Sequence, residues 1–329
     1  MKNIKLLALL LIGIIWSCGE KPVVVKEVIE TEINTEVTAI AIDKNNTKWI
    51  GTDKGLYKSV EEGYKLMDIS VTGKIYSLFY EESGNMLWIS TESALLKATI
   101  SDDDLSEIEV DNSNLSNPKV NDLHIDNSSK RWFGTELGIS LNYGETWKKE
   151  NFRINTEGDL FEMKIEDFPV NSIASWDGDY FFATSGAKLY RAFDYDESVD
   201  AFSGATQWDP PYNGPSITDT MFSVFVDNQG NQWMGGKEGI QVHTGHDAKD
   251  PQSFIYIFKD ELPDSYVLSI TQAANGDIWI GTRKGLAVFN GTAWETITEN
   301  LPDLYITAIA FDKVAGTWVG TKSGLVSLD

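Results

Sequence analysis

Short apolar runs alternate with clusters of polar, turn-forming residues along most of the chain. Three of these runs are VTAIAID at 37–43, MFSVFVD at 221–227 and ITAIAFD at 306–312, and polar clusters such as KNNT and NQGN follow them. Runs of this length, rich in β-branched residues and bounded by turn residues, are typical of strands. No helical periodicity occurs beyond the first residues, so the pattern predicts an all-β fold.

The apolar runs align into one repeated unit. Aliphatic residues hold one position of each run, namely Ile40, Leu78, Leu123, Ile173, Val224, Ile270 and Ile309. Small residues hold the preceding position in six runs, namely Ala39, Ser77, Ser172, Ser223, Ser269 and Ala308. Asp122 replaces the small residue in the remaining run. This carboxylate is expected either to contact a ligand in a central channel or to make a structural hydrogen bond.

An aromatic motif resembling Trp-Ile-Gly-Thr follows each apolar run. Its seven copies begin at Trp49, Trp88, Trp132, Phe181, Trp233, Trp279 and Trp318, at intervals of 39 to 52 residues. Four-stranded propeller blades repeat every ~40–50 residues. Each unit also holds two further strand-like segments, such as GLYKS and YKLMDIS. We therefore predict a seven-bladed β-propeller with four-stranded blades, forming a single domain over residues 23–329.

Packing and turn geometry explain the residues of this motif. The aromatic side chain is expected to fill the space between neighbouring blades. Gly51 and its equivalents let the next sheet approach closely, and Gly55 and its equivalents begin the third strand in a tight loop that needs positive φ. The motif is therefore interpreted as architecture and not as an active-site loop.

The repeated units resemble the two-component regulator propeller repeat family. The resemblance rests on the apolar strand, the Asp-containing turn, the W-x-G-T motif and the following Gly-Leu, and it extends from about residue 37 to 329. The second unit (Trp88-Ile-Ser-Thr) and the fourth unit (Phe181-Phe-Ala-Thr) depart from it. The resemblance implies the propeller fold and a habit of ligand binding. It does not by itself carry over a signalling role.

The last repeated unit ends after its third predicted strand. The segment VVVKEVIET at 23–31 is β-rich and belongs to no other unit. Because an unpaired outer edge is unfavourable, we expect this segment to pair outside residues 324–329 and to close the ring.

The N-terminus has the pattern of a secretion signal. A basic start precedes the apolar run 6–16, which is too short to span a bilayer. Cys18, the only cysteine, follows it, so residues 1–17 resemble a bacterial lipoprotein signal peptide and residues 18–22 a short tether. This implies a lipid-anchored protein of the cell envelope, with the outer membrane as the expected destination. Ordinary secretion with an incidental cysteine is the alternative.

The net charge of −23 makes nucleic acid an improbable partner, because such a surface repels phosphate. The connections between second and third strands are expected to look away from the membrane. They supply most candidate ligand-binding residues, namely Asp53, Lys54, Glu92, Glu136, Lys188, Lys237, Arg283, Lys284 and Lys322. Carboxylates gather in units two and three and cations in units four, six and seven. This division could orient a zwitterionic or acidic ligand; solvated loop charges are the other interpretation.

Two insertions supply aromatic candidates. The segment 150–169 contains Phe152, Phe161 and Phe168, and the segment 196–216 contains Trp208 and Tyr212. These rings could stack on sugars or anchor a protein, or they could cover the weakly conforming fourth unit.

Other polar residues carry weaker signals. His243, His246 and Asp247 lie close in sequence but lack a second cluster, and Asp102–Asp104 lack the spaced ligands of a calcium loop. We therefore expect neither a metal nor a cofactor. Aspartates at the ends of the apolar runs, such as Asp43 and Asp312, are interpreted as turn-forming residues.

These observations favour a binding or protein-interaction module over an enzyme. The expected partner is a glycan, a peptide or an envelope protein. The alternative is a propeller lyase or hydrolase with its site at the mouth of the central channel.

Overall fold

The computed structural model describes residues 12–13, 25–26, 29–69, 73–102, 104–111, 114–144, 146–150, 152–156, 159–163, 168–185, 189–196, 201–208, 220–244, 254–258, 260–314 and 316–328. Every regular element in these ranges is a strand. Within them, no helix has the length and apolar character needed to cross a membrane.

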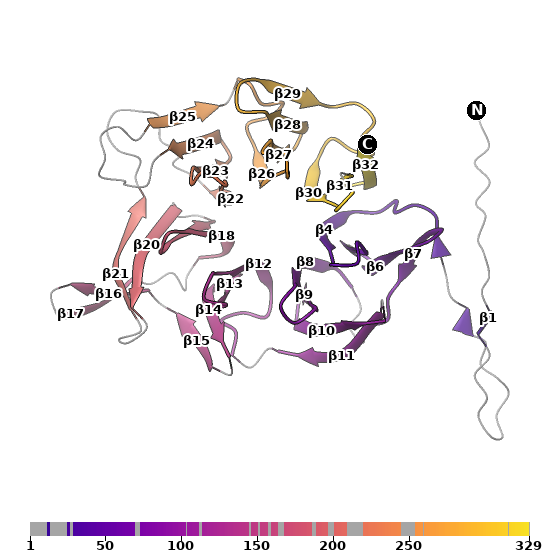
Figure 1. Cartoon of the computed structure of the whole chain (residues 1–329), viewed down its shortest axis with the longest axis horizontal. Helices are drawn as coiled ribbons and strands as arrows, with labels where there is room; N and C mark the ends of the chain where they lie inside the picture. The colour runs from indigo at the N-terminus through magenta and orange to yellow at the C-terminus, as the bar shows by residue number, and fades with distance from the viewer. Residues whose placement is uncertain are drawn as a thin grey trace.

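Seven antiparallel sheets, the blades, stand around a common centre (Figure 1). The innermost strands are β4 (Val37–Ile42), β8 (Ile75–Glu81), β12 (Val120–Ile125), β18 (Val170–Trp176), β22 (Met221–Val226), β26 (Val267–Gln272) and β30 (Ile306–Phe311). The second strands are β5 (Lys48–Thr52), β9 (Met86–Thr91), β13 (Arg131–Thr135), β19 (Asp179–Thr184), β23 (Gln232–Gly236), β27 (Ile278–Thr282) and β31 (Thr317–Thr321). The predicted seven-bladed propeller is confirmed.

Two further strands continue most blades outward. The third strands are β6 (Gly55–Val60), β10 (Leu95–Ser101), β14 (Gly138–Tyr143), β20 (Leu189–Asp196), β24 (Gly239–Thr244), β28 (Gly285–Phe289) and β32 (Gly324–Leu328). The fourth strands are β7 (Gly63–Leu66), β11 (Asp104–Val110), β15 (Thr146–Glu150), β21 (Ala201–Trp208), β25 (Phe254–Phe258) and β29 (Trp294–Ile297). Blade seven has three strands among the described residues.

The aromatic residues of the motif are packed between blades, as predicted. Trp49 and Trp132 are fully buried, whereas Trp279 and Trp318 are partly buried. Gly51 allows the close approach that the sequence suggested, because a Cβ there would lie 2.8 Å from Cγ2 of Ile75 in the next blade.

A carboxylate accepts the indole N–H of five motif tryptophans, whereas blade six has Ala273 at the corresponding position before Trp279. Oδ1 of Asp43 accepts the backbone N–H groups of Asn45 and Thr47, and Oδ2 accepts the indole N–H of Trp49 at 3.0 Å. An indole N–H donates in the same way, at 2.9–3.0 Å, to the carboxylates of Glu81, Asp126, Asp227 and Asp312. The turn-forming role of these aspartates is confirmed. The indole bond is an addition that the sequence analysis did not foresee.

The predicted closure of the ring by residues 23–31 is wrong. Strand β3 (Ile29–Glu30) pairs with β7 of blade one, and β2 (Val25–Lys26) pairs with β1 (Ile12–Gly13). Gly63 admits β3, because a Cβ at Gly63 would lie 2.3 Å from the carbonyl oxygen of Glu30. Just after this segment, buried Ile33 contacts blade seven, where the N–H of Leu325 donates to its backbone oxygen.

Side chains bridge the junction of blades seven and one. Nζ of Lys48 lies 3.2 Å from Oδ2 of Asp312 and 5.1 Å from the ring centroid of Trp318. Both partners are largely buried, with side-chain exposures of 13% for Lys48 and 5% for Asp312. Burial alone would raise the pKa of Asp312, but hydrogen bonds from Trp318, the turn backbone and Lys48 hold it well below its usual value.

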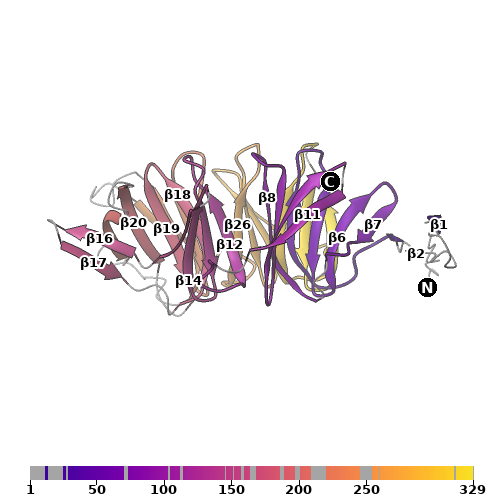
Figure 2. The same cartoon turned by 90° about the horizontal axis from the view of Figure 1, so that it is seen from below.

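The insertion at 150–169 extends blade four. Strands β16 (Phe152–Thr156) and β17 (Asp159–Met163) form a hairpin, and β16 runs parallel to β21. The hairpin lies at the outer edge of the ring (Figure 2). Phe202 of β21 packs against Trp132, with ring centroids 6.0 Å apart. These contacts favour the interpretation that the insertions cover blade four.

Replacing Lys48 by methionine should lower the free energy of unfolding by about 1–3 kcal/mol, because it removes the cation paired with a buried carboxylate. Chemical denaturation would measure the change. Lys44→Met, in the neighbouring exposed turn, is the matched control and should change stability by less than ~0.5 kcal/mol. Equal losses in the two variants would show that the bridge contributes nothing specific.

Candidate functional site on the upper face

The connections between second and third strands share one face of the ring with the starts of the innermost strands, because successive strands alternate in direction. We call this face the upper face. Eight predicted ligand residues lie in these connections, namely Asp53, Lys54, Glu92, Glu136, Lys237, Arg283, Lys284 and Lys322. Trp208 ends β21 in blade four, and Lys188 and Tyr212 lie outside the described residues.

In blade six, a guanidinium group stacks on a tyrosine. The Cζ atom of Arg283 lies 3.2 Å from the ring centroid of Tyr266, and Arg283 Nε donates to Oδ1 of Asp264 at 3.2 Å. The same carboxylate accepts the N–H of Tyr266 and pairs with Lys284 at 3.3 Å. Burial alone would raise the pKa of Asp264, but these hydrogen bonds lower it, so the carboxylate is ionised at neutral pH.

Blade seven repeats this arrangement with a lysine. Nζ of Lys322 lies 4.0 Å from the ring centroid of Tyr305. Asp303 accepts the N–H of Tyr305 at 2.8 Å and the hydroxyl of Ser323 at 2.9 Å. The bond from Tyr305 is the main reason why the pKa of Asp303 is lowered.

Blades one to three form an acidic counterpart around Tyr76. A hydrogen bond to Glu92 is the main cause that raises the pKa of the Tyr76 hydroxyl. Lys119 lies 4.3 Å from the Tyr76 ring centroid and 2.9 Å from the carboxylate of Glu136. Lys74 pairs with Glu36 at 3.1 Å. Of the predicted carboxylates, Glu136 is therefore paired with Lys119, a residue outside the predicted set, and Glu92 is bonded to Tyr76.

The tyrosines of the upper face were not among the predicted ligand residues. Tyr266 and Tyr305 stand in the repeated sequences LPDSY (262–266) and LPDLY (301–305), directly before an innermost strand. Tyr266 also stacks on Phe222 of the neighbouring blade, with centroids 6.1 Å apart. The repeated Pro-Asp-x-Tyr sequence was the feature that could have identified these tyrosines.

Asp122 makes a structural hydrogen bond between blades three and four. Its Oδ2 accepts the N–H of Ile173 at 2.6 Å, which confirms one of the two roles considered for it. Burial raises the pKa of Asp122 to about 6, although hydrogen bonds from Ile173, Ser172 and Leu123 oppose the shift. Nearby, Nε2 of His124 lies 2.7 Å from the hydroxyl of Ser175.

In the cluster of His243, His246 and Asp247, His243 is the one whose side chain is described. His243 is buried within blade five, where Nδ1 lies 2.6 Å from Oε1 of Gln232. His246, Asp247 and Cys18 lie outside the described residues. Where side chains are described, no group of three histidine, cysteine, aspartate or glutamate residues is suited to hold a metal ion.

Asp122→Asn should change the pH dependence of stability. The pKa of Asp122 is about 6 in the folded protein against an ordinary value of 3.8, so the folded state binds this proton more tightly. Relative to the variant, the wild-type protein should lose on the order of 1–2 kcal/mol as pH rises from about 4 to about 6. Urea denaturation across this pH range, with exposed Asp53→Asn as control, measures it. A pH-independent difference would contradict the assignment.

Comparisons with known proteins agree with this architecture. A family model described as two component regulator propeller matches residues 261–284. A streptogramin B lyase structure is similar in fold with a TM-score of 0.66 and 12% identity, over 92% of this chain and 96% of that one. A catalytically inactive virginiamycin B lyase from Staphylococcus aureus with quinupristin has a TM-score of 0.64 and 15% identity, over 92% and 97%.

A third solved structure is larger than this chain. It is an extracellular domain from B. thetaiotaomicron, with a TM-score of 0.43 and 14% identity, and the match covers 91% of this chain and 52% of that one. No curated protein sequence matches the chain. The segment matched by the family model contains β26, β27, Tyr266 and Arg283. The chain is therefore a seven-bladed β-propeller in which residues 261–284 match the two component regulator propeller model.

Proposed function

We propose that the chain is an extracytoplasmic binding module whose upper face captures a ligand with acidic groups. The partner is a glycan, a peptide or an envelope protein. One observation carries the proposal: Arg283 and Lys322 each hold a cation over a tyrosine ring at the same face. A cation beside an aromatic surface suits ligands that combine carboxylates with apolar faces.

The Arg283 side chain is oriented before any ligand arrives. Its Nε is used by Asp264, whereas its two terminal nitrogens have no hydrogen-bond partner in the described part of the chain. The side chain is 39% exposed, so these donors are accessible. Because the rotamer is already fixed, binding costs less conformational entropy. Two parallel bonds to a carboxylate are the geometry that a free guanidinium edge offers.

The carboxylates on the other half of the upper face favour a ligand that carries both signs of charge. Glu92 and Glu136 lie in blades two and three, whereas Arg283 and Lys322 lie in blades six and seven. A zwitterionic ligand would have its cationic part drawn toward the carboxylates and its acidic part toward the cations.

No reaction is proposed for this face. The likeness to the two lyase structures is at 12% and 15% identity and concerns the fold. The described upper-face residues form ion pairs and ring contacts, which account for their orientation without a catalytic role.

We also propose that Cys18 anchors the protein in the cell envelope. The basic start, the apolar run 6–16 and the single cysteine support this. A lipid on Cys18 would keep the propeller on one membrane surface, and the outer membrane remains the expected destination.

Binding through Arg283 can be tested on arrays of neutral and acidic glycans and by pull-down from envelope lysate. Arg283→Ala or Lys322→Ala should weaken capture at least about tenfold, the effect of losing one good charged contact. Lys44→Ala, on the other face, is the matched control and should bind normally. A ligand that binds all variants equally would place its site elsewhere.

Cys18→Ser should release the protein from membranes. Fractionation of cells that express the wild-type or the Cys18→Ser chain would compare the membrane-bound share. Wild-type protein that is already free of membranes would exclude the anchor and favour ordinary secretion.

A further inference from the structure

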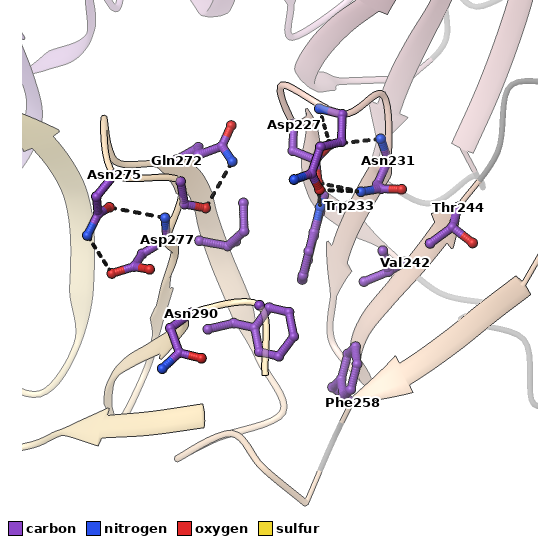
Figure 3. A pocket seen from close by; sticks show the side chains of 15 residues that line it. Asp227, Asn231, Trp233, Val242, Thr244, Phe258, Gln272, Asn275, Asp277 and Asn290 are labelled. Carbon is purple, nitrogen blue, oxygen red and sulfur yellow. Dashed lines mark hydrogen bonds between the residues drawn. The ribbon is translucent and has the colours of Figure 1, made fainter. Parts of the chain in front are cut away.

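A cleft of about 460 Å³ lies between blades five and six, on the face opposite the upper face (Figure 3). Asp227, Asn231, Trp233 and Phe258 of blade five contribute to it, and so do Ile278 and Phe289 of blade six. Pockets that hold small ligands span about 300–1,000 Å³. The cleft is therefore large enough for a ligand.

At two other blade junctions, a basic side chain occupies the equivalent space. Lys48 of blade one contacts the Asp312 carboxylate and the face of the Trp318 ring, both of blade seven. In blade three, Arg131 Nε donates to Glu81 at 2.8 Å, and its Cζ lies 6.0 Å from the ring centroid of Trp88. Both cations come from the residue directly before the motif aromatic. Each one contacts both the carboxylate and the indole ring of the preceding blade.

Ile278 holds this position at the junction of blades five and six. The carboxylate and the indole that would contact a cation are both present there, and Asp227 accepts the indole N–H of Trp233 at 2.9 Å. Both Asp227 and Trp233 line the cleft together with Ile278. The cleft therefore opens at the point where the other two junctions place a cation.

Aromatic rings add to the affinity of this space for a cation. Phe289 pairs in register with Ile278, at the position where blade three has Asn142 beside Arg131. The Phe258 and Phe289 centroids are 6.1 Å apart, and Trp294 packs behind both, 4.9 Å from Phe289. Ring faces attract ammonium and guanidinium groups, most strongly where water is excluded.

The carboxylates of the cleft have neutral hydrogen-bond donors in the part of the chain that the structure describes. Oδ2 of Asp227 accepts the amide of Asn231 at 2.8 Å in addition to the indole, and Oδ2 of Asp277 accepts the amide of Asn275 at 2.7 Å. Within the described ranges, neither carboxylate forms an ion pair with lysine or arginine. Among the described residues their donors are neutral, and Asp227 is only 3% exposed.

We infer that this cleft binds an organic cation, a primary ammonium or guanidinium group on an alkyl chain, in the place that Lys48 and Arg131 occupy at the other junctions. The source is either a free amine or a basic side chain of another protein. This site is independent of the upper face, which is proposed to take acidic groups.

Calorimetric titration of the full chain in about 0.15 M salt tests the inference, with the salt screening exposed charges. The probes are N-acetyl-lysine methylamide, agmatine and a short peptide with one central lysine. The norleucine analogue of the amide is the neutral control of the same shape. We expect saturable binding of the cations and none of the norleucine compound. Tighter binding of the peptide than of the free amide would identify a protein side chain as the source.

Ile278→Lys supplies the missing cation from within the chain. It should weaken binding of the probes at least about tenfold without lowering the melting temperature, because the new ammonium occupies the cleft. Ile278→Leu is the matched control and should bind normally. Phe258→Ala and Asp277→Asn provide second variants should the lysine variant fail to fold, and each should weaken binding severalfold.

Three results would overturn the inference. The first is that the lysine and norleucine amides bind equally well. The second is that folded Ile278→Lys binds the probes as tightly as the wild-type protein. The third is that many probe molecules bind weakly to each chain and that none of the cleft variants changes this binding. The last result would show general attraction of cations to an acidic surface.

Discussion

The structure depends on a carboxylate that bonds both its own turn and the indole of its blade. In the pair Asp43–Trp49, one oxygen accepts two backbone N–H groups of the turn while the other accepts the indole N–H. The turn and the ring are thereby fixed relative to each other, and the ring fills the space between sheets. In blade four both partners change together, because Trp176 replaces the carboxylate and Phe181, which has no N–H to donate, replaces the tryptophan. Blade six keeps Trp279 but has Ala273 in place of the carboxylate, so the bond stabilises five of the seven blades.

The same carboxylate connects neighbouring blades through the residue that precedes the next motif. Oδ2 of Asp126 accepts the hydroxyl of Tyr180 at 2.7 Å, as Asp312 accepts Lys48. Burial alone would raise the pKa of Asp126, but the bonds from Trp132 and Tyr180 lower it. A lowered pKa means that this contribution to stability is present at neutral pH and is lost as pH falls through the folded-state value. The bonds within and between blades therefore share one acidic group.

The amino-acid sequence was sufficient to predict the features that recur from blade to blade. The strands, the close approach at Gly51 and the turn role of Asp43 each recur at fixed offsets, so one copy supports another. The path of residues 29–33 occurs once, and it depends on the burial of Ile33 and on room at Gly63 that no repeat could reveal. The stacking of Arg283 on Tyr266 joins residues from two different loops. Periodicity locates each loop but not the contact between them.

Binding capacity should reside where a blade departs from the repeat. Where the arrangement is complete, as at Asp126 and Asp312, each polar group already has a partner: the carboxylate holds its turn and its indole, and the next blade supplies the third donor. A departure leaves one of these partners out. Ile278 leaves Asp227 and Trp233 without the cation that Lys48 supplies to Asp312 and Trp318, and the space between the blades remains open. Tyr266 and Tyr305 place rings beneath cations at two adjacent blades. The regular residues thus maintain the ring, and the irregular ones provide the groups that a ligand can engage.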